Sequence, residues 1–195
     1  MTHRLRSLLL IFAGLLGLVL TLPATAAGFD VAQLMSSLAR HPGGPATFVE
    51  TRHLALLDKP LVRTGEMRYT PPDRLEMRTL SPKPELMLLE RDSLTLERDQ
   101  RRMRIRLGSR PEVLAFVDSV RGLLAGDRTA MERSYLMQLQ GASERWVLTL
   151  HPKDADIAAL IQRITVTGTE AQIRTIEYQQ ADGDRSVLAI EPAKP

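Results

Sequence analysis

The stretch VRTGEMRYTPPDRLEMRTLSPKPELMLLERDSLTLERDQRRMRIRL, residues 62–107, places apolar side chains at alternate positions over much of its length. Alternate residues of a strand face opposite sides of a sheet, so a period of two predicts strands. Clusters such as PPD at 71–73 and SPKP at 81–84 divide the stretch into strand-length segments. We therefore expect an antiparallel meander of successive hairpins.

Helical spacing appears on both sides of this meander. In FDVAQLMSSLAR, residues 29–40, apolar side chains recur three and four positions apart, Asp30 can cap the first turn, and HPGGP ends the helix. Residues 111–125 regain the helical period before Gly126, and a shorter helix is expected from 128 to 133. The remaining expected elements are strands at 46–57, 135–142, 145–152, 164–168, 172–180 and 185–190, a short helix within 154–163, and a hairpin turn at Asp182 and Gly183. The predicted architecture is one curved sheet of about nine to eleven strands with a few helices packed on one face.

The N-terminal segment has the features of a cleaved secretory signal peptide. Arg4 and Arg6 precede an apolar run at residues 8–20, and the small residues ATAA follow at 24–27. We expect cleavage after Ala26, or one residue later, which leaves 27–195 as a single exported domain. No later segment approaches the about 20 apolar residues of a membrane-spanning helix, so we expect the exported domain to be soluble.

Composition narrows the classes of function further. The chain has no cysteine, which excludes disulfides, thiolate metal sites and a thiol nucleophile. It carries 26 basic and 23 acidic side chains, and loss of Arg4 and Arg6 with the leader leaves 24 basic ones. Such a nearly neutral exported domain has no overall attraction for nucleic acid, and we expect no nucleic-acid partner.

The segment RRMRIRLGSRP at 101–111 contains five arginines. In a strand, Arg102, Arg104 and Arg106, here called the arginine row, face one side, while Met103 and Ile105 face the other. The pairs expected from a hairpin about Asp99 and Gln100 are Leu96 with Met103, Leu94 with Ile105, and Glu97 with Arg102. The arginine row is therefore interpreted as the solvated outer face of a half-buried sheet, in preference to a dedicated anion site.

No catalytic signature is present. His41, His53 and His151 are far apart and lack the H-E-x-x-H spacing, and the chain has no nucleophile elbow and no phosphate-binding glycine loop. The sequence DGD at 182–184 offers too few ligands for calcium and is expected to form a turn. We therefore expect a non-enzymatic protein with no catalytic residues, no metal site and no cofactor.

The order of these elements resembles the periplasmic outer-membrane lipoprotein carrier family, the LolA-type proteins, and its divergent LolA-related branch. The similarity is carried by FVETRH (48–53), GEMRYTPPDRLEMRTLSPKPELMLLERDSLTLE (65–97), VRGLLAGD (120–127), ERWVLTLHP (144–152), IQRITVTG (161–168) and YQQADGDRSVLAI (178–190). This resemblance implies an unclosed antiparallel β-barrel, mainly β with some α, whose concave face is occupied by helices.

The resemblance also implies a monomeric carrier that shelters acyl chains of a lipoprotein or another lipid between an inner-membrane donor and an outer-membrane acceptor. Each buried CH₂ contributes about 0.8 kcal/mol, so a 14-carbon chain requires roughly 11 kcal/mol of shelter. Flexible methionines suit variable apolar cargo. The expected lipid-binding residues are Phe48, Met67, Tyr69, Leu75, Met77, Leu94, Leu96, Met103, Ile105, Val117, Val120, Trp146 and Leu148.

Two features differ from the typical carrier. Thr70 or Pro71 stands where the family has an arginine, and aromatic residues make up only 4% of the chain. Whether the replaced arginine changes cargo release stays open. The cargo therefore stays open between a lipoprotein and another lipid, including a pigment-related one. The alternative function is a non-catalytic envelope scaffold with a filled core and a basic docking face. A continuous apolar cavity under the helices would favour the carrier.

Overall fold

The structure, a computed structural model, describes residues 28–109 and 111–193; the expected signal peptide at 1–26 lies outside them. The described residues form one antiparallel sheet whose eleven strands do not close into a barrel, with helices beside it, which confirms the expected fold class. The strands are β1 (Gly44–His53), β2 (Leu61–Thr70), β3 (Arg74–Ser81), β4 (Glu85–Glu90), β5 (Ser93–Arg98), β6 (Arg101–Arg106), β7 (Tyr135–Ala142), β8 (Arg145–Pro152), β9 (Ile161–Thr169), β10 (Gln172–Gln180) and β11 (Arg185–Pro192).

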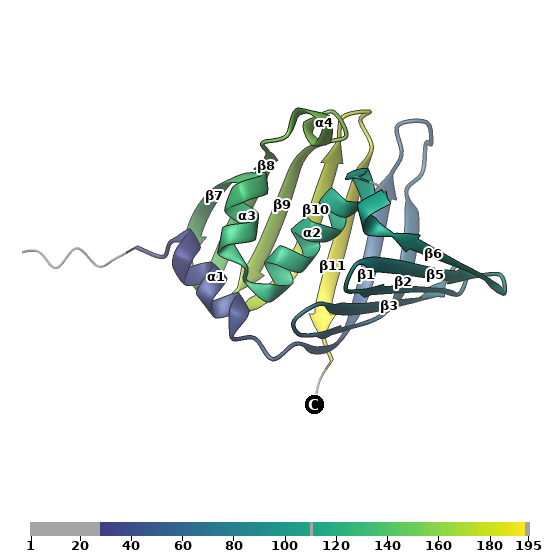
Figure 1. Ribbon diagram of the computed structural model, residues 1–195, viewed down its shortest axis with the longest axis horizontal. Coiled ribbons are helices and arrows are strands. Elements are labelled where there is room, and N and C mark those ends of the chain that lie inside the picture. The colour runs from purple at the N-terminus through teal and green to yellow at the C-terminus, as the bar shows by residue number, and fades with distance from the viewer. Residues whose placement is uncertain (1–27, 110, 194–195) are drawn as a thin grey trace, which may run out of the picture.

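The strand order is β6-β5-β4-β3-β2-β1-β11-β10-β9-β8-β7. The chain thus runs outward from the centre to the β6 edge, crosses to the β7 edge, and returns to the centre, where the first and last strands pair. Between Ala46 and His53, β1 pairs residue by residue with β11. Figure 1 shows this centre, with β1 and β11 side by side.

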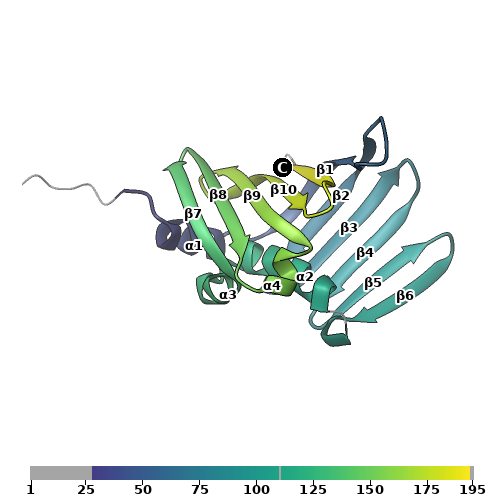
Figure 2. The same ribbon diagram turned by 90° about the horizontal axis from the view of Figure 1, so that it is seen from above.

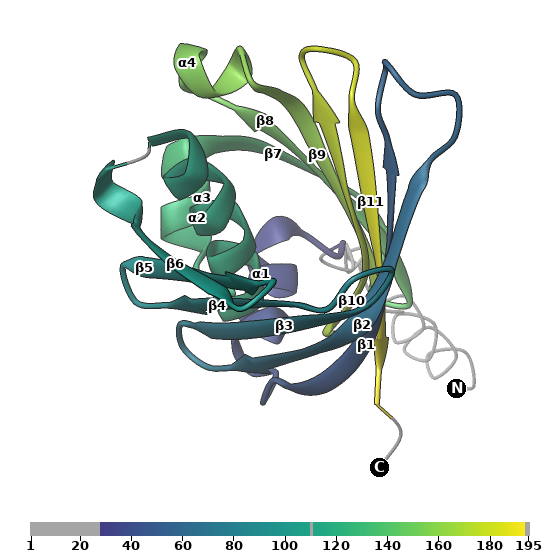
Figure 3. The same cartoon turned by 90° about the vertical axis from the view of Figure 1, so that its right-hand side faces the viewer.

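Four α-helices accompany the sheet in the described part of the chain: α1 (Val31–Ala39), α2 (Pro111–Ala125), α3 (Arg128–Ser134) and α4 (Ala155–Ala158). A 3₁₀ turn, η1 (Leu107–Ser109), precedes α2. α2 and α3 form the crossover between the two sheet edges, and with α1 they lie on the concave face (Figures 1 and 2). Viewed from the side, the sheet curves around them (Figure 3).

The local signals read from the sequence account for several element ends. Asp30 caps α1 by accepting a hydrogen bond from the Gln33 backbone N–H at 2.8 Å. The expected helix over 111–125 is α2. The expected turn at Asp99 and Gln100 joins β5 to β6, with both residues at positive φ, 50° and 61°. Its three expected cross-strand pairs are all present.

Two boundaries differ from the expectation. The first strand ends at His53, and residues 54–57 belong to the loop that follows, in which Leu56 is exposed. The helix expected within 154–163 is only α4, because Ile161 already pairs with Gln180 and is buried as the first residue of β9. Burial of Ile161 in the sheet thus outweighs its place in a helical sequence pattern.

Half of the concave face is filled by a tightly packed core. α1 contributes Leu34, Met35 and Leu38, and the facing strands β8 and β9 contribute side chains that are fully buried. Gly126, at φ 62°, lets the end of α2 approach the backbone of α1 so closely that a Cβ would collide with Met35 and Ala39. This close approach fixes α1 against α2. No helix among the described residues is long and apolar enough to cross a bilayer.

Candidate functional site

The other half of the concave face holds a cavity of about 370 Å³ between α2 and the sheet. Its wall combines side chains of the outward run of strands, β1 to β5, with others from β9, β10 and β11. Val117, Val120 and Leu124 of α2 face it from the helix side. Cavities of roughly 300–1,000 Å³ are typical of small-molecule sites, so this one is large enough for a ligand but small for two long acyl chains.

Six of the residues expected from the sequence line this cavity: Met67, Leu75, Met77, Leu94, Val117 and Val120. They come from the three strands β2, β3 and β5 and from α2, and the sheet register explains why they converge. Met67 pairs with Met77, and Met77 pairs with Met87 on the next strand, so three methionines lie side by side on one face. Their flexible side chains give this wall an adaptable surface.

Three of the expected residues are part of the surrounding packing. Trp146 and Leu148 on β8 are 0% exposed and belong to the filled half of the core. The Trp146 ring lies over Gly168, where a Cβ would collide with it, and its Nε1 donates to the Glu170 carbonyl at 2.9 Å. Phe48 is buried beside Gly65.

Tyr69 lines a smaller pocket of about 220 Å³, which shares Met67, Leu124 and Ile190 with the main cavity. Its hydroxyl donates to the Pro72 carbonyl at 3.0 Å. The two positions expected to replace the family arginine, Thr70 and Pro71, are both exposed at the end of β2.

The remaining three expected residues lie toward the β6 edge. Leu96 and Ile105 are half-buried and pack against the core. Met103 is 52% exposed and does not line the cavity, because β6 is the outermost strand and the helices that occupy the concave face lie inward of it. The alternating pattern therefore predicted the correct face of the strand for Met103. It could not predict how far that strand lies from α2.

Several lining residues were not expected from the sequence. Met87 and Leu89 lie in the continuous apolar run LMLL, in which both faces of the strand look alike. Only the pairing of Met87 with Leu96 and of Leu89 with Leu94 identifies the concave side. Ile176 on β10 belongs to the cavity wall because β1 pairs with β11 at the centre of the sheet. No local sequence pattern predicts that pairing.

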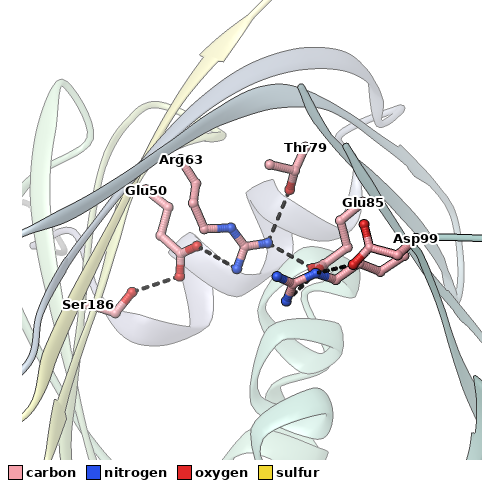
Figure 4. Close-up of polar contacts among 7 residues, drawn as sticks. Glu50, Arg63, Thr79, Glu85, Asp99 and Ser186 are labelled. Atoms are coloured by element: carbon pink, nitrogen blue, oxygen red, sulfur yellow. Dashed lines mark hydrogen bonds and ion pairs between the residues drawn. The ribbon is translucent and has the colours of Figure 1, made fainter. Parts of the chain in front are cut away.

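One end of the cavity is polar. We call Glu50, Arg63, Thr79, Glu85 and Ser186 the polar band; they come from β1, β2, β3, β4 and β11 (Figure 4). Arg63 reaches Glu50 at 3.3 Å and Glu85 at 2.9 Å, and also donates to Thr79 Oγ1 at 3.1 Å. The Ser186 hydroxyl donates to Glu50 at 3.0 Å. These side chains satisfy one another next to an apolar wall.

A buried hydroxyl anchors α2 to the sheet. Ser119 of α2 is fully buried and forms side-chain hydrogen bonds with Tyr135 of β7 and Tyr178 of β10. Burial raises the pKa of both phenols above their ordinary value near 10, although the Ser119 hydrogen bond acts in the opposite direction. Both phenols therefore stay protonated at physiological pH and available to the serine.

No group of three or more histidine, aspartate or glutamate side chains among the described residues is arranged to hold a metal ion. The DGD sequence forms the turn between β10 and β11. Its Asp182 and Asp184 carboxylates accept backbone N–H donors, from Asp184 at 3.0 Å and from Ala55 at 2.9 Å. These carboxylates therefore serve the loops that connect the central strands.

The solved structures that this chain matches have low sequence identity to it. A LolA superfamily protein from Nitrosomonas europaea has 11% identity and a TM-score of 0.46, with 86% of this chain and 96% of that chain covered. A putative outer membrane lipoprotein-sorting protein domain from Vibrio parahaemolyticus has 13% identity and a TM-score of 0.41, with coverage of 84% and 89%. The MucA/MucB complex of Pseudomonas aeruginosa has 12% identity and a TM-score of 0.45, with coverage of 86% and 59%.

Comparison with curated proteins gives no match. A family model described as outer membrane lipoprotein carrier protein LolA-like matches residues 23–193. The match extends from before α1 to the end of the described chain and includes every element that lines the cavity.

Proposed function

Because the chain belongs to the outer membrane lipoprotein carrier LolA-like family, we propose that its cavity shelters an acyl chain of a lipoprotein or a related lipid during transfer toward the outer membrane. The observation that carries this proposal is the apolar cavity between α2 and the methionine-lined strands. A scaffold with a filled core would have no such space, so the cavity favours the carrier.

The size of the cavity has a consequence for loading. A volume of about 370 Å³ lies near the lower end of the range for small-molecule sites. Larger cargo then needs α2 to move, because among the helices of the described residues only α2 contributes side chains to the cavity wall. In the empty carrier, α2 shields the apolar strands from solvent and from aggregation.

The cellular setting is part of the same proposal. Residues 1–26 act as a cleaved signal peptide, and 27–195 work as a monomeric, non-catalytic periplasmic domain. An inner-membrane protein supplies the cargo, and an outer-membrane protein receives it. Cargo, donor and acceptor can be identified from lipids and proteins that copurify with the domain.

Binding of a fluorescent fatty acid tests the cavity directly. Met77 lines the cavity, whereas Leu80 on the same strand is 54% exposed. Met77→Glu places a carboxylate against the acyl chain and should weaken binding more than about tenfold, which corresponds to about 1.4 kcal/mol. Leu80→Glu is the matched control and should bind like wild type.

Both variants should remain folded, as judged by circular dichroism. Normal binding by Met77→Glu, or equal losses in both variants, would contradict the proposal. Absence of any fatty-acid binding by the wild type would contradict it as well.

A further inference from the structure

The cavity has an apolar wall and a polar end, and two arginines, Arg63 and Arg52, lie at the polar end. The two arginines differ in whether carboxylates of the described residues pair with them. Arg63 is only 31% exposed and is held by two carboxylates, Glu50 and Glu85, which are themselves 20% and 24% exposed. Ion pairs at this depth fix the guanidinium in one geometry. Arg63 is therefore a structural member of the polar band, with its charge already compensated.

Arg52 differs from Arg63 in this respect. It lies two residues beyond Glu50 on the same face of β1, lines the cavity, and is half-buried. Within the part of the chain that the structure describes, its guanidinium forms no hydrogen bond or ion pair. A half-buried cation without a partner is costly, and an anion that reaches it gains a charge-assisted hydrogen bond.

One neutral donor, the side-chain amide of Gln180, lines the same cavity as Arg52. The cross-strand neighbour of Arg52 on β11 is Ser186, and Ser186 in turn pairs with Tyr178 on β10. Gln180, two residues further along β10, also lines the cavity, and its side-chain amide forms no hydrogen bond with the described residues. A guanidinium and an amide N–H thus border the cavity at its polar end, with the apolar wall continuing from them.

We propose that this end of the cavity recognises an oxyanion headgroup, a carboxylate or a phosphate, of an amphiphile whose chain lies along the methionine wall. Arg52 forms the ion pair, and Gln180 donates a further hydrogen bond. Glu50 is tied to Arg63 and Ser186, so it leaves Arg52 uncompensated and repels a second anion from the Arg63 side. This inference rests on the proposed function, since it assigns a headgroup to the same ligand.

Matched 14-carbon amphiphiles test the headgroup preference. Myristate, tetradecyl phosphate and tetradecanol would each compete with a fluorescent fatty acid for the purified domain, residues 27–195. Wild type should bind at least one of the two anions about tenfold more tightly than the alcohol. Which anion shows the preference distinguishes a free fatty acid from a phosphate-bearing lipid.

Arg52→Gln should reduce anion affinity to that of the alcohol and leave alcohol binding unchanged. Arg68→Gln, an exposed arginine on the other face of β2, is the control and should keep the preference. Equal affinities for anion and alcohol in wild type would overturn the headgroup inference while leaving the carrier intact. So would an equal loss of both in Arg52→Gln. Failure of all three amphiphiles to bind would overturn the proposed function itself.

Discussion

One half of the concave face is filled and the other contains the cavity. We therefore predict that truncation to alanine lowers the unfolding free energy more at Leu148, in the filled half, than at Met77, in the cavity wall. Leu148 is fully buried on β8, where it pairs with Leu139 and Val166. Leu148→Ala leaves a void that its neighbours cannot fill, and such truncations cost about 2–5 kcal/mol. At about 2–4 °C per kcal/mol for a chain of this length, the melting temperature should fall by roughly 4–20 °C.

Met77 faces space that is already empty, and it is only half-buried. Met77→Ala therefore loses part of one transfer free energy, about 1 kcal/mol, without creating a new void. Thermal unfolding followed by circular dichroism should show a fall of about 2–4 °C. Equal falls for Met77→Ala and Leu148→Ala would refute the division, because both sites would then be packed core.

Three further results are expected. On lipid binding, hydrogen exchange should change more in α2 than in β8, because α2 lies over the cavity whereas β8 is in the filled core; equal changes would contradict a movable α2. Replacing the arginine row with glutamine should cost little stability, since the ion pair of Arg102 with Glu97 at 3.1 Å is exposed, and should leave cosedimentation with anionic vesicles at low salt unchanged. A several-fold loss of cosedimentation that disappears when salt is added would indicate that the row docks the protein on membranes. Gly168→Ala should lower the unfolding free energy by about 1–3 kcal/mol, because the new Cβ would collide with the Trp146 ring, whereas the control Gly108→Ala, with open space around it, should have little effect. Similar melting temperatures for the two variants would show that the ring can shift.

Local signals were sufficient for the elements whose partners are close in sequence. The β5–β6 register followed from alternation and a two-residue turn, since a hairpin fixes which residues face each other. The same reasoning could not locate the cavity. Its two walls meet only because β1 pairs with β11, and that pairing joins segments at opposite ends of the domain.

The polar band and Arg52 show a second reason for the limit. These residues lie within a few positions of the ends of their strands, so in the sequence each one looks like an ordinary polar or charged residue near a loop. Only the assembled sheet brings Glu50 and Glu85 within hydrogen-bonding distance of Arg63 and leaves Arg52 without an ion pair among the described residues. Charge clusters of this kind depend on tertiary pairing and leave no periodic signal in the sequence.

The pairing of the first strand with the last also constrains the order of folding. Glu50 and Ser186, which meet across it, are 136 residues apart. Closing a loop of that length costs about 2 kcal/mol more entropy than closing one of ten residues, so the local hairpins on either side should form first. The pairing of β1 cannot be completed until residues 185–192 are present. Met77 and Ile176 line opposite parts of the cavity wall, one in each half of the sheet. A chain truncated before β11 could therefore build both halves and still have no cavity.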